Sequence, residues 1–260
     1  MIPPLEKSRV ILYEYPFNEK IRTYLRLEHL FARLFTLQER IDALDHHFAL
    51  ITLFEILNVG ARPDLKTDVL KDLDRQRQTM LAYRGNPGIA TDVLERLLTQ
   101  LEECFVTLTN ISGKLGHELN ENDWLKSLRS RTSIPGGTCE FDLPAYYAWQ
   151  KLGDRRRQDD LREWVSGLVP LFNGIHLLLS LLRDSGAPQK MVAMGGQFQQ
   201  NLPQGRTFQL LRLSLDPNLG AIPEISANRL VASIRFVRHD ADGKLYGNSA
   251  DTPFDLTLCA

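Results

Sequence analysis

The chain turns sharply at TSIPGGTCEFDLPAYYAWQ, residues 132–150, a run of turn-forming residues between two stretches of helical pattern. Pro135 fixes its own φ and favours an extended backbone at the residue before it, while Gly136 and Gly137 permit positive φ. Asp142, two residues ahead of a proline, is predicted to cap a new helix that carries this proline in its first turn. The fuller pattern of a phosphate-binding loop is missing, so we interpret the segment as a structural turn.

Apolar residues recur every three or four positions on both sides of this turn, which predicts a mostly helical domain. The predicted helices begin at the caps Asn18, Asp64 and Thr91 and also cover about residues 40–59 and 122–131. After the turn, Arg155–Arg157 precede two aspartates, so we expect ion pairs within one helix. Pro170 is expected to break or kink the helical run that stops near Gly186.

Short β-rich runs separated by Gly, Pro, Asn and Asp follow residue 188 and predict antiparallel strands. The predicted strands are Arg9–Tyr15 near the N-terminus and Thr207–Leu215, Leu230–Arg238 and Phe254–Leu258 near the C-terminus. A lone strand cannot satisfy its backbone hydrogen bonds, so the first strand is expected to fold back onto the C-terminal region. The prediction is an α+β protein, in which residues 1–15 and 188–260 form a small antiparallel β domain and residues 16–187 a helical domain.

The composition is that of an ordinary globular protein, with 43% apolar and 24% charged residues. A formal net charge of −1 gives no global attraction to nucleic acid or to an anionic membrane. Three scattered cysteines suit a reducing cytosol and predict neither a disulfide framework nor a zinc knuckle. Charged residues follow the N-terminus at once, and the apolar run 168–182 is short and interrupted, so neither a secretory signal nor membrane insertion is predicted.

The sequence carries no recognisable catalytic constellation. His46 and His47 are neighbours about 100° apart on a helix, so they cannot share a metal ion as an i, i+4 pair does. The HExxH and GxSxG patterns are missing, and Glu140 beside Cys139 opposes the formation of a thiolate. We therefore predict a protein that is not an enzyme and has no cofactor, no metal site and no catalytic residues.

Arginines on predicted strands offer a binding surface instead. Arg229 and Arg235 share one face of a predicted strand, and Arg212 is a candidate for an adjacent strand. Arginine binds carboxylates in bidentate fashion, so such a face can hold an extended acidic peptide. An ordinary solvent-facing sheet is an equally good interpretation of these residues alone. The alternative function, nucleic-acid binding through the same basic sheet face, would require aromatic residues among the cations and a basic domain, and neither is evident.

Four motifs in order along the chain carry a family resemblance. They are YPFNEK at Tyr15–Lys20, LKDLDRQ at Leu70–Gln76, SIPGG at Ser133–Gly137 with FDLP at Phe141–Pro144, and IRF at Ile234–Phe236. Together they closely resemble the ZapD family of bacterial cell-division proteins. The resemblance implies a cytosolic homodimer that binds the acidic and apolar C-terminal tail of the tubulin-like protein FtsZ. By holding more than one tail, such a dimer would cross-link FtsZ filaments at the mid-cell division ring.

The resemblance also implies which residues bind the tail. Arg235 matches the family's strand arginine, and Arg62 and Arg26 match basic positions of the helical domain. Val231 stands where relatives can carry a second strand cation, and Asp123 and Tyr147 stand where a relative can present basic or histidine side chains. For the dimer, the aromatic residues of the helical domain are candidates for surplus apolar surface. These aromatic residues are Phe31, Phe35, Phe48 and Tyr146.

Overall fold

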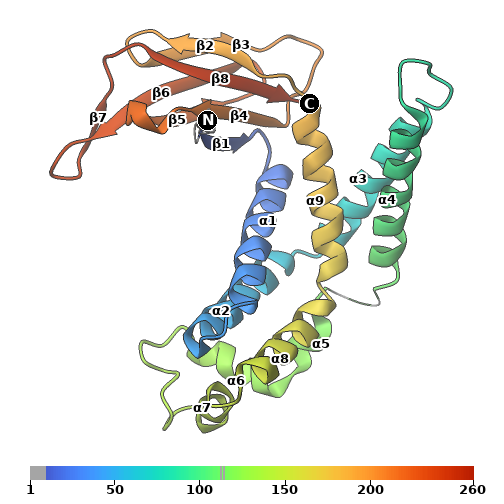
Figure 1. Ribbon diagram of the computed structural model, residues 1–260, viewed down its shortest axis with the longest axis vertical. Coiled ribbons are helices and arrows are strands. Elements are labelled where there is room, and N and C mark those ends of the chain that lie inside the picture. The colour runs from blue at the N-terminus through green and yellow to red at the C-terminus, as the bar shows by residue number, and fades with distance from the viewer. Residues whose placement is uncertain (1–9, 112, 114) are drawn as a thin grey trace, which may run out of the picture. The chain divides into compact units, whose positions relative to one another are not determined.

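The computed structural model of the protein describes residues 10–111, 113 and 115–260. They form two compact units, which we call the helical unit (Thr23–Leu179) and the β unit (residues 10–22 with Ser180–Ala260). Helices dominate one unit and antiparallel strands the other, which confirms the predicted α+β class (Figure 1). The unit boundaries fall inside two helices, α1 (Glu19–Gln38) and α9 (Val169–Asp184).

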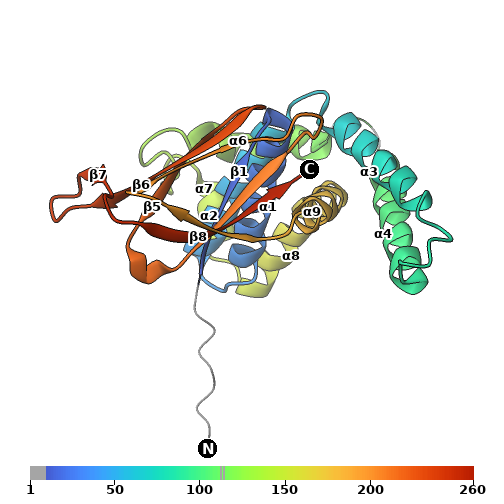
Figure 2. The same ribbon diagram turned by 90° about the horizontal axis from the view of Figure 1, so that it is seen from above.

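The other helices belong to the helical unit, and several begin at side-chain caps. They are α2 (Ala43–Gly60), α3 (Leu65–Leu81), α4 (Thr91–Thr109), α5 (His117–Glu121), α6 (Asp123–Arg131), α7 (Pro144–Gln150) and α8 (Asp154–Ser166). The predicted cap Asn18 is confirmed, because its Oδ1 accepts a 2.9 Å hydrogen bond from the amide of Ile21. Asp42 and Asn122 cap α2 and α6 in the same way. Antiparallel neighbours α3 and α4 lie side by side (Figure 2).

Some helix starts differ from the prediction. Thr91 and Asp142 are not caps: Ala90 and Leu143 occupy the N-cap positions of α4 and α7, one residue away from each. At α7 the proline is the first helical residue, so the residue directly before it must be the cap. Asp64 does hold the N-cap position of α3 but makes no capping hydrogen bond there. The five-residue helix α5 was not predicted, because it is too short to show a periodic pattern.

Pro170 begins a helix and does not kink one. It is the second residue of α9, after a break between Ser166 and Val169. A first-turn residue donates no hydrogen bond within its own helix, so proline costs nothing at this position. The expected interruption of the helical run at Pro170 is therefore confirmed, as a break between two helices.

The segment after α6 is the expected turn. Gly136 takes positive φ, at 70°, and a side chain on Gly137 would come within 2.7 Å of the carbonyl oxygen of Arg131. The turn leads into α7, whose buried residues are Tyr146 and Trp149. Trp149 donates a 2.9 Å hydrogen bond from Nε1 to Asp160. A cluster of four aromatic rings results, since Trp124 and Trp164 stack with their centroids 5.1 Å apart beside these two.

The arginine run of α8 is only partly paired as expected. Arg156 does form the i, i+4 ion pair with Asp160, at 2.9 Å. Arg157 instead is buried, with 6% of its surface exposed, and makes no ion pair within the described part of the chain. It donates to His46 Nδ1 at 2.9 Å and to the carbonyl oxygens of Ile41, Gln150 and Leu152. Arg157 therefore ties α8 to the segments at the start of α2 and the end of α7.

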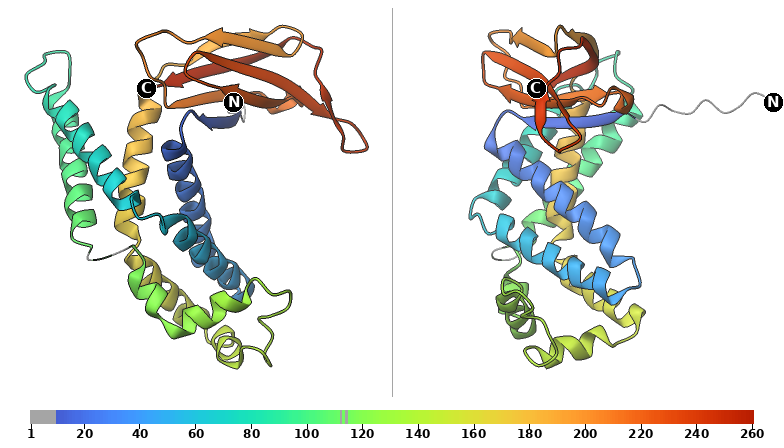
Figure 3. Two further views of the ribbon diagram at one scale, coloured as in Figure 1. Left: turned by 180° about the vertical axis from the view of Figure 1, so that it is seen from behind. Right: turned by 90° about the vertical axis from the view of Figure 1, so that its left-hand side faces the viewer.

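The β unit consists of two antiparallel sheets. Its strands are β1 (Ile11–Pro16), β2 (Gln189–Ala193), β3 (Gln197–Asn201), β4 (Leu210–Leu215), β5 (Ile222–Ala227), β6 (Val231–His239), β7 (Leu245–Gly247) and β8 (Thr252–Cys259). One sheet has the order β1-β4-β8-β2, and the other has β3-β6-β5 with β7 paired to β6. The blue N-terminal strand lies against the orange and red C-terminal strands (Figure 3). The predicted return of the N-terminal strand is thereby confirmed, with Ile11 opposite Leu215.

Both sheets contribute to one apolar core. Leu211, Leu213 and Leu256 come from the first sheet, and Ile234 and Phe236 from the second. The two sheets therefore pack face to face. Along β6 the side chains alternate between the core and the solvent as far as Phe236, whereas Val237, on the face of Arg235, is also buried.

Within the described ranges no single helix is both long and apolar enough to cross a membrane. Taken together, α8 and α9 are long and apolar enough for a membrane span, but there is a bend of 68° between them.

Candidate functional site

The solvent face of β6 carries Arg235, as the alternation predicted. Ala232, Ile234 and Phe236 are buried in the core, whereas Arg235 is exposed. Glu224 of β5 lies directly opposite in the strand register, and its Oε2 accepts from Nε and Nη2 of Arg235 at 2.9 and 2.5 Å. This carboxylate partner was not foreseen, because it depends on how β5 and β6 pair.

Arg235 lines a shallow groove across strands β3, β5 and β6, which we call the strand-face groove. Its volume is about 510 Å³, and its lining residues are Gln197, Phe198, Gln199, Glu224, Ile225, Ser226, Ser233, Ile234 and Arg235. Among these residues Arg235 is the single cation and Glu224 the single anion, so the groove has no net charge. Both side chains are well exposed, at 64% and 43%, and an exposed ion pair contributes only about 0–1 kcal/mol. A carboxylate from a ligand could therefore replace Glu224 at little cost.

Arg229 and Arg212 do not share this face. Arg229 lies in the turn between β5 and β6, two residues before Val231 begins the strand, so its placement on the strand was wrong. Arg212 lies on β4, which belongs to the other sheet, so the predicted neighbouring strand was also wrong. Sheet membership follows from which distant segments pair, and side-chain alternation along one segment cannot show it.

Arg212 is already paired inside the β unit. Glu14, opposite Arg212 in the β1–β4 register, accepts from its Nε at 3.0 Å. The same carboxylate accepts two hydrogen bonds of 2.8 Å from Arg183. All three side chains are mostly buried, so they join the N-terminal strand to β4 and to the end of α9.

In the helical unit the structure brings two candidate arginines to one side of α1. Arg26 is exposed on α1, and Arg62 is exposed in the turn between α2 and α3. Arg62 Nη1 donates a 2.9 Å hydrogen bond to Thr23 Oγ1. Thr23 and Arg26 are three residues apart on the helix and so face the same way. The guanidinium of Arg62 is therefore held beside the turn of α1 that carries Arg26.

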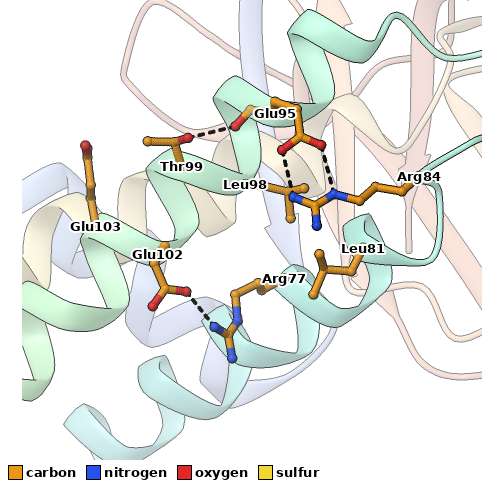
Figure 4. Close-up of a pocket in the computed structure, with 8 residues that line it drawn as sticks. All are labelled: Arg77, Leu81, Arg84, Glu95, Leu98, Thr99, Glu102 and Glu103. Carbon is orange, nitrogen blue, oxygen red and sulfur yellow. Dashed lines mark hydrogen bonds and ion pairs between the residues drawn. The ribbon is translucent and has the colours of Figure 1, made fainter.

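Other charged residues of the helical unit compensate one another. A pocket between α3 and α4 is lined by eight residues, several of them charged, as Figure 4 shows. Arg84 pairs with both carboxylate oxygens of Glu95, at 2.8 and 2.7 Å, and Arg77 bonds to Glu102 at 2.5 Å. These arginines are occupied within the hairpin, so the pocket offers a ligand little uncompensated positive charge.

Burial shifts the pKa of several titratable groups of the protein. His46 is fully buried, and burial, together with the Arg157 charge, lowers its pKa although its Nε2 is 2.7 Å from the carbonyl oxygen of Arg40. Burial likewise raises the pKa of the Cys104 and Cys259 thiols. Across the described ranges no group of His, Cys, Asp or Glu side chains is placed to hold a metal ion.

The loop before β4 carries a cation that the sequence did not single out. Arg206 follows Pro203, Gln204 and Gly205, and its guanidinium lies over the ring of Phe208, 5.2 Å from the centroid. The one feature of the sequence that could have pointed to Arg206 is its position directly after a Pro-Gln-Gly turn. An irregular loop has no periodicity, however, so the direction of the side chain cannot be predicted from the sequence.

The described part of the chain thus combines a helical unit and an antiparallel β unit, each with exposed arginines. A family model described as the ZapD cell division protein matches residues 25–235. The chain belongs to the ZapD family of cell-division proteins, as the four motifs indicated.

Proposed function

We propose that this protein is a non-catalytic cytoplasmic division factor that binds the C-terminal tail of FtsZ. As a homodimer it would cross-link FtsZ filaments and promote assembly of the ring at mid-cell. The observation that carries the proposal is the family match over residues 25–235. The exposed arginines of both units support it, because an acidic tail needs cations that are accessible to an extended peptide.

The proposed tail-binding residues are Arg235, Arg229, Arg62, Arg26 and Arg212. Arg235 would exchange Glu224 for a carboxylate of the tail, which costs little at an exposed pair. Arg212 would have to leave Glu14 in a more buried setting, so its substitution is expected to affect stability as well as binding. Because the contacts are charge-rich, we expect a micromolar dissociation constant for a single tail that rises with salt concentration.

Filament cross-linking requires two linked sites, since one weak site cannot join two filaments. An exposed apolar stripe at the start of α2 supports a dimer: Ile41, Leu44 and Phe48 are 69%, 60% and 51% exposed. Leu44 and Phe48 are four residues apart on α2 and share one side of it, and Ile41 lies just before the N-cap residue. Two of the aromatic residues proposed for this role, Phe31 and Tyr146, are buried in the core of the helical unit. The stripe that includes Phe48 is therefore the candidate dimer surface.

Filament sedimentation tests the proposal. Wild-type protein should increase the amount of FtsZ in the pellet, and deletion of the FtsZ tail should abolish this increase. Arg235→Glu should pellet less FtsZ, whereas Arg155→Glu, a charge reversal at an exposed position of α8, should behave as wild type. No added pelleting by wild-type protein would exclude the function. Equal pelleting by Arg235→Glu would remove that arginine from the mechanism.

A further inference from the structure

A second groove of the β unit lies where the β5–β6 turn meets the loop between β3 and β4, and we call it the turn groove. It has a volume of about 510 Å³. Its lining residues are Phe17, Asn18, Leu202, Pro203, Gln204, Gly205, Arg206, Thr207, Phe208, Asn228, Arg229 and Leu230. They include two arginines and no carboxylate, in contrast to the balanced strand-face groove.

The β5–β6 turn presents a cation and an apolar side chain next to each other. Asn228 Oδ1 accepts from the amides of Leu230 and Val231 at 2.8 and 3.0 Å, and the amide of Asn228 donates to the carbonyl oxygen of Val231 at 2.9 Å. The backbone of the turn is therefore fixed before any ligand binds. Arg229 is exposed, and the neighbouring Leu230 is 65% exposed.

The facing loop is attached to this turn and supplies the second cation. The amide of Leu202 donates a 2.8 Å hydrogen bond to the carbonyl oxygen of Leu230. Further along the loop, Arg206 lies over the ring of Phe208, which is itself largely buried in the core. A guanidinium stacked on an aromatic face keeps the N–H donors at its edge available to a carboxylate.

The charge of this groove is uncompensated. Within the described part of the chain neither Arg206 nor Arg229 forms an ion pair, whereas Arg235 and Arg212 each have a glutamate partner. A ligand carboxylate would therefore meet two guanidinium groups without displacing an internal partner. Leu230 and the half-buried Phe17 add apolar surface beside them. This combination fits a segment in which acidic and apolar side chains are neighbours.

We propose that the turn groove, with Arg206 and Arg229 as its cations and Leu230 as its apolar contact, holds an acidic and apolar peptide segment. This inference rests on the proposed function, in which that segment is the FtsZ tail. It adds Arg206 and Leu230 to the binding residues and assigns the stronger carboxylate contact to the turn groove, since there no glutamate competes with the ligand. The strand-face groove would then bind a further part of the same segment.

Fluorescence anisotropy with a labelled FtsZ tail peptide and the full-length protein tests this inference. Arg206→Glu and Arg229→Glu should each weaken binding about tenfold or more, because reversal adds repulsion to the lost contact. Arg206→Gln, which removes the charge with little demand on the fold, should weaken binding less, by about threefold to tenfold. Leu230→Ser should weaken binding at every salt concentration, and Arg155→Glu should not change it. Thermal unfolding of each variant verifies that the fold is intact.

The possible outcomes separate this inference from the proposed function. The turn groove is excluded, and the function stands, if wild-type protein pellets FtsZ in a tail-dependent manner but the variants bind the peptide normally. Normal binding means a dissociation constant within about twofold of wild type for Arg206→Gln, Arg206→Glu and Arg229→Glu. If wild-type protein binds no tail, both are excluded. A single-stranded oligonucleotide that displaces the peptide at equal concentration through the same arginines would overturn the choice of a peptide as the ligand.

Discussion

Three consecutive arginines of α8 provide a graded test of what burial does to a charged side chain. Arg155 and Arg156 are exposed, and Arg156 pairs with Asp160, whereas Arg157 is 6% exposed. Replacing Arg157 with alanine would leave four acceptors without their donor: His46 Nδ1 and the carbonyl oxygens of Ile41, Gln150 and Leu152. Within the described part of the chain, alanine at Arg155 removes no hydrogen bond or ion pair, and alanine at Arg156 removes one ion pair of Asp160, whose carboxylate still accepts from Trp149 Nε1.

The expected magnitudes follow from these contacts. A buried acceptor left unsatisfied costs about 1–3 kcal/mol, and four of them give less than their sum because water can reach those near the surface. Removing Arg157 also relieves the cost of burying its charge, which offsets part of the loss. We therefore expect Arg157→Ala to lower the free energy of unfolding by about 2–4 kcal/mol. Arg156→Ala should cost about 0–1 kcal/mol, and Arg155→Ala less than about 0.5 kcal/mol.

Urea denaturation followed by tryptophan fluorescence measures all three variants, since Trp149 and Trp164 lie in the same part of the helical unit. The order Arg157, Arg156, Arg155 in destabilisation is the expected result. Arg157→Lys should recover only part of the loss, because a single ammonium group cannot reach acceptors on several segments as the planar guanidinium does. Equal stability of Arg157→Ala and Arg155→Ala would refute the reasoning.

Two further predictions concern the pH dependence of stability and the steric effect of replacing a glycine. Burial lowers the pKa of both His46 and His47 below the ordinary value of 6.5, so the unfolded chain takes up protons first as the pH falls. The free energy of unfolding should be highest above pH 6.5. Below that pH it should fall by up to about 1.4 kcal/mol per pH unit for each histidine until the folded-state pKa is reached. If the free energy of unfolding of His46→Gln falls as steeply with decreasing pH as that of wild type, the prediction is contradicted. Gly196→Ala would place a Cβ 1.9 Å from the carbonyl oxygen of Asn248 at φ +74°, and should destabilise the β unit by about 3 kcal/mol or more in denaturation experiments. Gly243→Ala, at φ +79° with nothing nearby, should cost only about 1 kcal/mol, and similar losses for both would disprove the steric argument.

Local patterns predicted the elements because the relevant physics is local. The helices follow the spacing of apolar residues, and the Asn18 cap needs only the next three residues. The strand at residues 11–16 was predicted to pair with the C-terminal region from a backbone argument alone, and it does pair with β4. The turn at residues 132–150 followed from the conformational preferences of proline and glycine.

The composition of the candidate site depended on pairing between distant segments, which periodicity does not encode. Glu224 meets Arg235 only because β5 and β6 are in one register, and Arg212 meets Glu14 because β1 joins β4. Arg157 was expected to form an ion pair within its own helix, yet its donors satisfy backbone acceptors on other segments. Arg206 lies in an irregular loop, where the sequence predicts a turn but not what the side chain faces.

The β unit takes one strand from the beginning of the chain and the others from its end, and this order has a consequence for synthesis. Pro16 ends β1, and Leu210 begins its partner β4 about 190 residues later. At about 5–20 residues per second, a ribosome needs roughly 10–40 s to make that intervening length. Throughout this interval β1 has emerged without the strand it pairs with, and the helical unit can fold first. Nascent chains stalled before residue 210 should therefore expose an unpaired strand that chaperones can bind.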